Sequence, residues 1–246
     1  MISVIIPTYN NEGFVSSTIS FLKTHAYTRL LKEIIVVDAG STDRTLAEAR
    51  AAGATILRSM RKGRSVQMNL GAECATGQIL YFITPGTTPP ANYCNEIVRS
   101  YQKKNYLGTF TMEPNQGHWL TKALSWYMNV KQKYSRLENQ SLFVDRELFV
   151  KAGGFHEDLL MMEDHELVIR LQRYSRFDII RKSVQTCANG FSGHRVFRTE
   201  MSYMLSFWLY ENGISTSKIQ KLYSILAGER KQEVPQVEPE LSASFN

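Results

Sequence analysis

The segment IIVVDAGSTD, residues 34–43, decides the fold class of this 246-residue chain. It begins with four β-branched residues, which favour a buried strand, and it ends in Asp38 and a Gly-Ser-Thr turn. A helical pattern follows through Ala52, which Ser41 or Thr42 could cap. The segment therefore predicts a strand, a polar loop and a helix in succession, which is the repeating unit of an α/β sheet.

The same unit recurs on both sides of this segment. We expect strands over residues 3–6, 33–37, 54–57 and 79–83, with helices over 11–25, up to 52 and over 65–75. Such alternation predicts right-handed crossovers and a mostly parallel, Rossmann-like sheet flanked by helices. Ligands of these sheets bind at the carboxyl ends of the strands, so the candidate site lies in the loops at 7–12, 38–43, 61–64 and 84–88.

Beyond Pro90 the pattern is less regular, and we expect this part to confer specificity. It predicts strands over 107–112 and 141–144 and helices over 91–103, 118–134, 163–174, 197–210 and 215–226. The expected organisation is one α/β domain over 1–195, with a nucleotide half (1–90) and an acceptor half (91–195). Two helices within 196–227 pack on it as a C-terminal helical extension, and the Glu-, Pro-, Gln- and Ser-rich tail at 228–246 is disordered.

Composition limits the classes of partner and the location. The net charge of +6 fits anionic partners such as nucleotide phosphates, lipid headgroups or nucleic acid. The basic residues are scattered and form no nucleic-acid reader motif, which disfavours nucleic acid. The three cysteines are widely spaced and predict neither a disulfide framework nor a zinc site.

The apolar runs are much shorter than the ~20 residues of a membrane span, and Met1 leads directly into a strand pattern instead of an export signal. We therefore expect a cytoplasmic protein. The aromatic helix at 118–134 carries Trp119, Trp126 and Tyr127 together with lysines. These residues are more often packing than function, but they leave peripheral contact with the inner face of the membrane open.

The acid and the basic turn that follow the second and third strands each have two interpretations. Asp38 can form its own turn, or it can hydrogen-bond a nucleoside at the ligand edge. Arg61, Lys62 and Arg64 can be a solvated turn or can hold a diphosphate. No phosphate-loop or dinucleotide-binding glycine motif occurs, so ATPase and dinucleotide oxidoreductase chemistry are not indicated.

Acids also open the helix expected at 163–174. Glu163 and Asp164 can serve the helix dipole, or one of them can act as a general base above a cleft. His156, His165 and His194 lie in unlike contexts without metal-ligand spacing, so we expect them not to bind metal.

Several motifs in order carry a resemblance to a known family. They are ISVIIPTYNNE at 2–12, VVDAGSTD at 36–43, GRSVQMNLGA at 63–72, and GGF at 153–155 leading to LMMED at 160–164. Together they resemble family 2 glycosyltransferases of the GT-A fold, within a small bacterial subgroup, from residue 2 to about 227. The resemblance implies an inverting transferase of the hexosyl type that uses a nucleotide-diphosphate sugar.

The resemblance also implies roles for individual residues. Asp164 would deprotonate the acceptor hydroxyl, with Glu163 beside it, and Arg64 would lie near the phosphates. Gln140 would lie near the acceptor. The nucleoside would be held by two loops, through Pro7, Thr8, Tyr9, Asn10, Glu12, Asp38, Gly40 and Ser41.

The segment ILYFITPGTTPP, residues 79–90, departs from the family pattern. After this strand the family places an acidic D-x-D type motif that holds Mn²⁺ or Mg²⁺ against the diphosphate, whereas here Gly86 occupies the position of the metal-holding Asp. Loss of the ion should cost several kcal/mol of transition-state stabilisation. Two further departures remove charge: Glu138-Asn139-Gln140 replaces Gly-Asp-Gln, and Asn189-Gly190 replaces a basic pair.

Two interpretations remain. In the favoured one, the enzyme works without a tightly held metal, and the basic turn supplies positive charge to the departing diphosphate. In the other, the chain is a pseudoenzyme that binds a nucleotide, a glycan or a partner. The sequence specifies neither the sugar nor the acceptor, which could be a lipid, a glycan or a small molecule.

Overall fold

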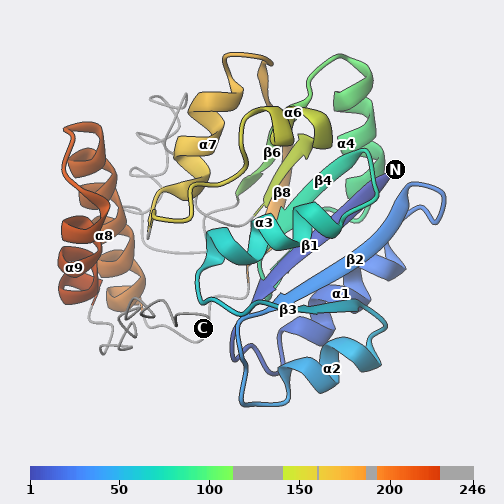
Figure 1. The fold of residues 1–246 in the computed structure, drawn as a ribbon, viewed down its shortest axis with the longest axis horizontal. Coiled ribbons are helices and arrows are strands. Elements are labelled where there is room, and N and C mark those ends of the chain that lie inside the picture. The colour runs from blue at the N-terminus through green and yellow to red at the C-terminus, as the bar shows by residue number, and fades with distance from the viewer. Residues whose placement is uncertain (113–140, 160, 187–192, 228–246) are drawn as a thin grey trace, which may run out of the picture.

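The computed structural model describes residues 1–112, 141–159, 161–186 and 193–227 (Figure 1). The strands are β1 (Ile2–Thr8), β2 (Leu31–Asp38), β3 (Thr55–Arg58), β4 (Ile79–Ile83), β5 (Thr87–Thr88), β6 (Leu107–Met112), β7 (Ser141–Asp145) and β8 (Phe177–Thr186). The helices are α1 (Val15–Thr24), α2 (Thr45–Ala51), α3 (Arg64–Cys74), α4 (Tyr93–Gln102), α6 (Arg146–Lys151), α7 (Glu163–Leu171), α8 (Gly193–Glu211) and α9 (Thr216–Ala227).

The strands form one sheet in the order β3-β2-β1-β4-β7-β6-β8-β5. The first four strands in this order, β3-β2-β1-β4, are all parallel, as the strand-helix alternation predicts. Thr8 pairs with Asp38, so β1 and β2 end at the same level of the sheet. The loops that follow them therefore meet at the carboxyl edge.

The other half of the sheet is mixed. β7 is antiparallel to both β4 and β6, β5 is antiparallel to β8, and only β6 and β8 are parallel there. The alternation that forces parallel pairing ends at β4, so the whole sheet is a mixed eight-stranded sheet. Strand β8 occupies a segment for which we predicted no element.

Helices cover both faces of the sheet. Val4 and Ile6 of β1 face α1 and α4, whereas Ile5, between them, packs against α3, because successive side chains of a strand point to opposite faces. On the α3 face, the buried side chains of α6 and α7 complete the core. Two apolar layers on one sheet explain why β1 is buried along its full length.

Pro7 does not stop β1, which continues to Thr8. The pairing of β1 with β4 ends at Ile5, so beyond that residue β2 is the one strand paired with β1 among the described residues. A strand with one open side can hold a proline, whose missing N–H would break a ladder on the other side.

Helices α8 and α9 form a hairpin, in which the Arg198 side chain donates to the carbonyl of Ala227 at 2.8 Å. Met201, Leu205 and Trp208 lie on the solvent-exposed side of α8. Within the described ranges, no helix combines the length and apolarity needed to cross a membrane. The aromatic helix predicted at 118–134 and the tail at 228–246 lie outside the described residues, and membrane contact stays a prediction.

Candidate functional site

The loops after β1 and β2 are interlocked by hydrogen bonds. The backbone N–H of Asn10 donates to Ser41 Oγ at 2.9 Å, and that of Asn11 donates to Thr45 Oγ1 at 2.7 Å. In return, the N–H of Thr42 donates to Asn10 Oδ1 at 2.9 Å. The two loops therefore form one unit at the carboxyl edge of the sheet.

Glu12 belongs to the same unit. Its N–H donates to Asp43 Oδ2 at 3.0 Å, and its carboxylate accepts from the N–H of Arg44 at 3.2 Å. The hydrogen bond from Thr45 helps to keep the pKa of Asp43 low. Because these residues are committed to the loop, α1 begins at Val15 and not at the predicted position 11.

Asp38 is buried, with 1% of its surface exposed, and its carboxylate is occupied by its own loop. Oδ2 accepts from the N–H groups of Gly40 and Ser41 at 2.9 Å each, and Oδ1 accepts from the hydroxyls of Ser41 and Thr8. The predicted capping of α2 by Ser41 or Thr42 is wrong, because Arg44 is the N-cap and Ser41 bonds to Asp38 instead. A role of Asp38 at the nucleoside stays a prediction.

Helix α3 ties the third loop to this edge. Gln67 Nε2 donates to the carbonyls of Thr8 at 2.8 Å and Val37 at 2.6 Å. In the loop before α3, Lys62 Nζ lies 4.8 Å from the centroid of the Tyr9 ring. Tyr9 is 37% exposed, so its ring is accessible at the carboxyl edge of the sheet.

Arg64, one turn before Gln67, joins α3 to the start of α7. Its Nη1 lies 2.7 Å from Glu163 Oε1 and 2.6 Å from Asp164 Oδ2. Both acids are almost fully buried, with side-chain exposures of 6% and 5%. The structure thus brings together three predicted site residues that are about a hundred positions apart in the sequence.

The environment of Asp164 suits a base. Burial and the charge of Glu163 raise its pKa and Arg64 lowers it, with the net result that the pKa is raised to about 6. Oδ2 is paired with Arg64, whereas Oδ1 is buried and has no hydrogen-bond partner in the described parts of the chain. This oxygen can accept a proton without first losing a protein partner.

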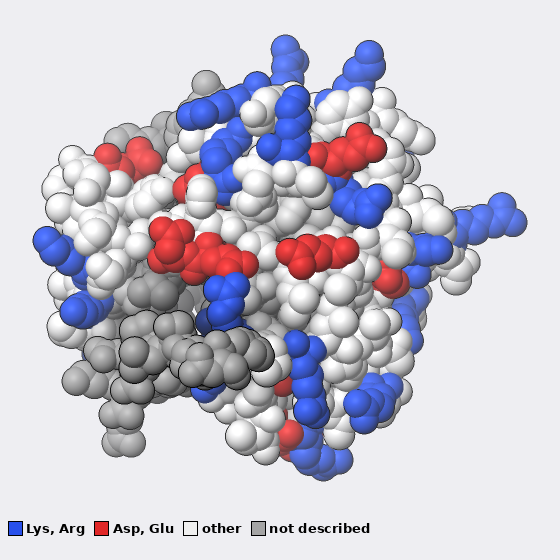
Figure 2. Space-filling model, in the orientation of Figure 1, with Lys and Arg blue, Asp and Glu red and all other residues white. Residues whose placement is uncertain are grey.

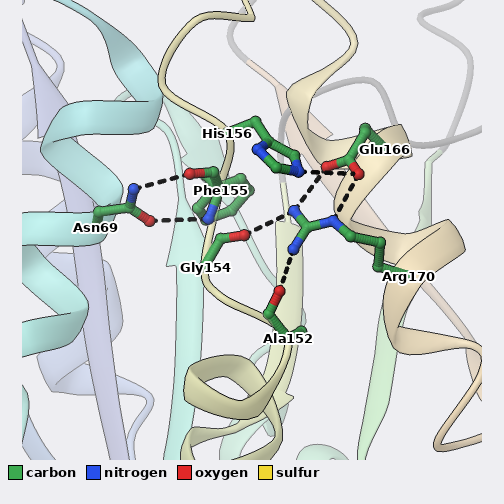
Figure 3. Close-up of polar contacts among 7 residues, drawn as sticks. All are labelled: Asn69, Ala152, Gly154, Phe155, His156, Glu166 and Arg170. Carbon is green, nitrogen blue, oxygen red and sulfur yellow. Dashed lines mark hydrogen bonds and ion pairs between the residues drawn. The ribbon is translucent and has the colours of Figure 1, made fainter.

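A clamp that the sequence did not predict holds the GGF loop before α7 (Figure 3). Asn69 of α3 donates from Nδ2 to the Phe155 carbonyl and accepts from the Phe155 N–H, at 2.9 Å each. Arg170 of α7 donates to the carbonyls of Ala152 and Gly154. The loop is therefore held from the two helices that also carry Arg64 and Asp164.

Glu166 keeps the Arg170 side chain in place. It accepts from Nε at 2.5 Å and from Nη2 at 2.6 Å, and His156 Nε2 lies 3.5 Å from the same carboxylate (Figure 3). Glu166 and Arg170 have the i, i+4 spacing of a helical ion pair, which was the one sequence signal for this contact. Asn69 lies inside the GRSVQMNLGA motif, but nothing in its spacing indicated a loop 86 residues away.

His165 lies between α7 and the C-terminal hairpin. Its side chain is buried, its Nε2 is 3.2 Å from Glu211 Oε1, and its ring meets those of Phe207 and Tyr210 edge to face. In the part of the chain that is described, no group of three or more potential metal ligands occurs, and the expectation that the histidines bind no metal stays a prediction. His165 instead joins α7 to α8.

The corner after β4 is a tight turn. The N–H of Thr87 donates to the carbonyl of Thr84 at 3.2 Å, and Gly86 has φ +80°. Pro at the second position and a left-handed Gly at the third are typical of a type II turn. The Gly86 N–H donates to Thr18 Oγ1 at 2.9 Å, which fixes the corner on α1.

This donor set does not fit a family metal ion. Hard divalent cations such as Mn²⁺ and Mg²⁺ prefer carboxylates, and residues 84–87 offer hydroxyl and backbone oxygens instead. Gln140 and the departures at 138–139 and 189–190 lie outside the described residues. No step proposed below uses a metal.

Basic and acidic side chains are interspersed on the face drawn in Figure 2. They do not gather into a single basic stripe on that face, and the expectation that the chain binds no nucleic acid stays a prediction.

Comparisons with known proteins identify relatives. The model of a family described as "Glycosyl transferase family 2" matches residues 3–154. An uncharacterized glycosyltransferase of Haemophilus influenzae is 20% identical over 190 residues, which cover 72% of this chain and 64% of that protein. The match thus spans less than two thirds of that relative's length.

Two solved structures share the fold. Glucosyl-3-phosphoglycerate synthase from Mycobacterium tuberculosis, in complex with Mn²⁺, UDP and phosphoglyceric acid, has a TM-score of 0.63 and 18% identity over 87% of this chain and 79% of its own. A mannosyltransferase from Pyrobaculum calidifontis, in complex with GDP-Man and Mn²⁺, has a TM-score of 0.66 and 18% identity over 92% and 68%. At such identities the likeness concerns the fold alone.

Proposed function

This chain belongs to glycosyltransferase family 2 and has a GT-A-like fold, and on that premise we propose that it is an inverting transferase that moves a hexose from a nucleotide-diphosphate sugar to an acceptor hydroxyl. The observation that carries the proposal is the contact of Arg64 with Glu163 and Asp164. It brings the Arg64 guanidinium, from the proposed nucleotide half, into contact with Asp164, the proposed base, from the proposed acceptor half. The hexoses named with solved neighbours, in UDP-Glc and GDP-Man, support a hexosyl donor.

We assign the nucleoside to the interlocked loops after β1 and β2. Tyr9 offers an exposed ring on which a base can stack, and Lys62 beside it offers a positive charge. Asp38 and Ser41 shape the loop that carries the site. The remaining predicted contacts belong to the same unit, through Pro7, Thr8, Asn10, Glu12 and Gly40.

We assign the role of base to Asp164. In a single displacement, the acceptor oxygen attacks the anomeric carbon from the side opposite the diphosphate. The bond to the diphosphate breaks, and Oδ1 of Asp164 takes the hydroxyl proton, so the configuration inverts. A carboxylate with a pKa near 6 holds such a proton better than an ordinary aspartate.

The departing diphosphate needs positive charge, and the corner at Gly86 offers no carboxylate to hold a metal. We assign this task to Arg61, Lys62 and Arg64. Arg61 now pairs with Glu157, Lys62 with the Tyr9 ring, and Arg64 with the two acids. Bound diphosphate must compete with these contacts.

A binding protein without transfer activity is the second candidate. It is favoured by the turn at Gly86, which removes a charged group that the family uses in catalysis. In that case the chain would bind a nucleotide or a glycan through the same edge.

The test is a panel of nucleotide sugars in a thermal unfolding assay, with Mn²⁺ and with chelator, followed by a nucleotide-release assay. A ligand at a hundred times its Kd should stabilise the native state by about 2.7 kcal/mol. We expect stabilisation without Mn²⁺ and slow nucleotide release that Asp164→Asn abolishes. Binding with no release in the presence of acceptor mixtures would favour the pseudoenzyme. Stabilisation by no member would overturn the transferase and every nucleotide-binding form of the second candidate.

A further inference from the structure

Arg64 is shared between the two halves of the site in a way that the transfer reaction alone does not require. One nitrogen, Nη1, contacts both carboxylates. The Arg64 side chain is 24% exposed, whereas the side chains of the two acids are almost fully buried. We propose, on the basis of the proposed function, that Arg64 is a donor-operated switch: it moves from Glu163 and Asp164 to the diphosphate and makes Asp164 a stronger base only when donor is bound.

Geometry indicates that Arg64 is the partner that moves. It is the first residue of α3 and follows Gly63, whose φ of +144° is a glycine conformation. The adjacent Lys62 already reaches Tyr9 on the donor edge. Glu163 and Asp164, in contrast, lie in the first turn of α7, which is held by the Arg170 clamp on the loop before it.

The charges favour such a transfer. Within the described residues, one guanidinium faces two buried carboxylates, and a carboxylate without a full share of a cation is costly in a nonaqueous environment. A diphosphate at the neighbouring basic turn offers Arg64 a second anion that is more accessible to solvent.

Other charged groups around Asp164 have partners of their own. From α7, His165 contacts Glu211 of α8, and Glu166 contacts Arg170 and His156. From the loop before α3, Arg61 contacts Glu157. Among the groups described, Arg64 of α3 and Glu163 of α7 are therefore the charges that act most directly on Asp164.

The sign of the effect follows from these partners. Burial and Glu163 raise the pKa of Asp164 and Arg64 lowers it, so loss of Arg64 raises it above its present value of about 6. Removing an adjacent cation changes a carboxyl pKa by roughly 1–3 units. At pH 7 the protonated fraction of Asp164 would then rise but stay below one, so donor binding takes up a fraction of a proton and the carboxylates that stay ionised act as the base.

Calorimetric titration tests this in the full-length chain. The probe is the best-binding nucleotide sugar of a panel covering the five common bases, because its diphosphate diester has no group that titrates near neutral pH. Titration at pH 7 in buffers of different ionisation enthalpy gives the number of protons bound. We expect uptake at pH 7 that shrinks at pH 5, where Asp164 is already protonated.

Two variants assign the proton. Asp164→Asn, nearly isosteric, should bind the donor without proton uptake. His156→Gln, which removes a nearby titratable group that contacts Glu166 and not Asp164, should keep the uptake. Binding by the wild type with no uptake, or uptake that survives in Asp164→Asn, would overturn the switch while leaving the proposed function in place. Absence of binding by the whole panel would overturn both.

Discussion

Asn69 pairs with both backbone polar groups of Phe155, accepting from its N–H and donating to its carbonyl at 2.9 Å each. This is the pattern of a neighbouring strand, supplied here by one side chain. The Phe155 ring is buried in the core on the α3 face of the sheet. The contact therefore fixes both the backbone and the ring of the loop that leads to α7.

Replacement of Asn69 by Ala should destabilise the protein by about 2–3 kcal/mol, because two partly buried backbone groups lose their partner. Urea denaturation measures the free energy of unfolding. Asn95→Ala is the matched control, since Asn95 is an exposed amide on α4, and it should change stability by less than about 0.5 kcal/mol. Equal effects of the two substitutions would contradict the role of the clamp.

Arg170→Lys should destabilise by about 1–3 kcal/mol. Lysine keeps the charge but cannot reach Glu166 with two parallel donors and the carbonyls of Ala152 and Gly154 at once. Arg173→Lys, an exposed position just after the same helix, is the control and should be nearly neutral. If the loop positions Asp164, Arg170→Lys should also lower kcat more than it raises KM, which steady-state kinetics would reveal.

Much of the fold could be predicted because turn residues in the sequence mark the ends of its strands. The strands predicted at 79–83 and 107–112 have the bounds of β4 and β6, since turn residues flank each apolar run. β8 was missed because its residues, FDIIRKSVQT, show no strict alternation, and its pairing partners β6 and β5 are about 70 to 100 residues away. Long-range pairing of that kind leaves no local trace.

The site was predicted from motifs and not from spacing. Local chemistry placed Asp38 after a strand, but it could not show that the carboxylate is saturated by its own loop. The contact of Arg64 with Asp164 joins residues 100 positions apart, and the resemblance alone suggested that they share a site. Asn69 was missed because an amide inside a helix is ordinarily a surface residue.

Gly86→Asp should cost about 1 kcal/mol of stability, because φ is +80° and aspartate tolerates this region only moderately. If the corner is aligned with the metal motif of the family, the same variant should gain Mn²⁺-dependent binding of a nucleotide sugar. Gly86→Ala carries a similar strain without a ligand, so it separates the two effects. Equal Mn²⁺ dependence of both variants in calorimetry would refute the alignment.

Tyr9→Ala should weaken nucleotide binding by roughly 5- to 150-fold, since stacking on an aromatic ring is worth about 1–3 kcal/mol per base. The ring is 37% exposed, so the stability of the unliganded protein should change little. Tyr9→Phe keeps the ring and loses the hydroxyl that lies 3.4 Å from Lys62 Nζ, and it should bind nearly as well as the wild type. Unchanged affinity in Tyr9→Ala would remove the ring from the site.

Asp164 should make stability depend on pH in a recognisable window. Its pKa is raised from 3.8 to about 6, so the native state binds more protons than the unfolded state between these values. Stability from this group is therefore present at low pH and lost as the pH rises from about 4 through 6, by up to about 3 kcal/mol.

Asp164→Asn, uncharged throughout, should lack this loss, so its stability relative to the wild type should increase from pH 4.5 to pH 8. Urea denaturation at several pH values measures the difference, and the exposed Asp158→Asn should run parallel to the wild type. A constant difference between Asp164→Asn and wild type across this window would show that Asp164 titrates as an ordinary aspartate.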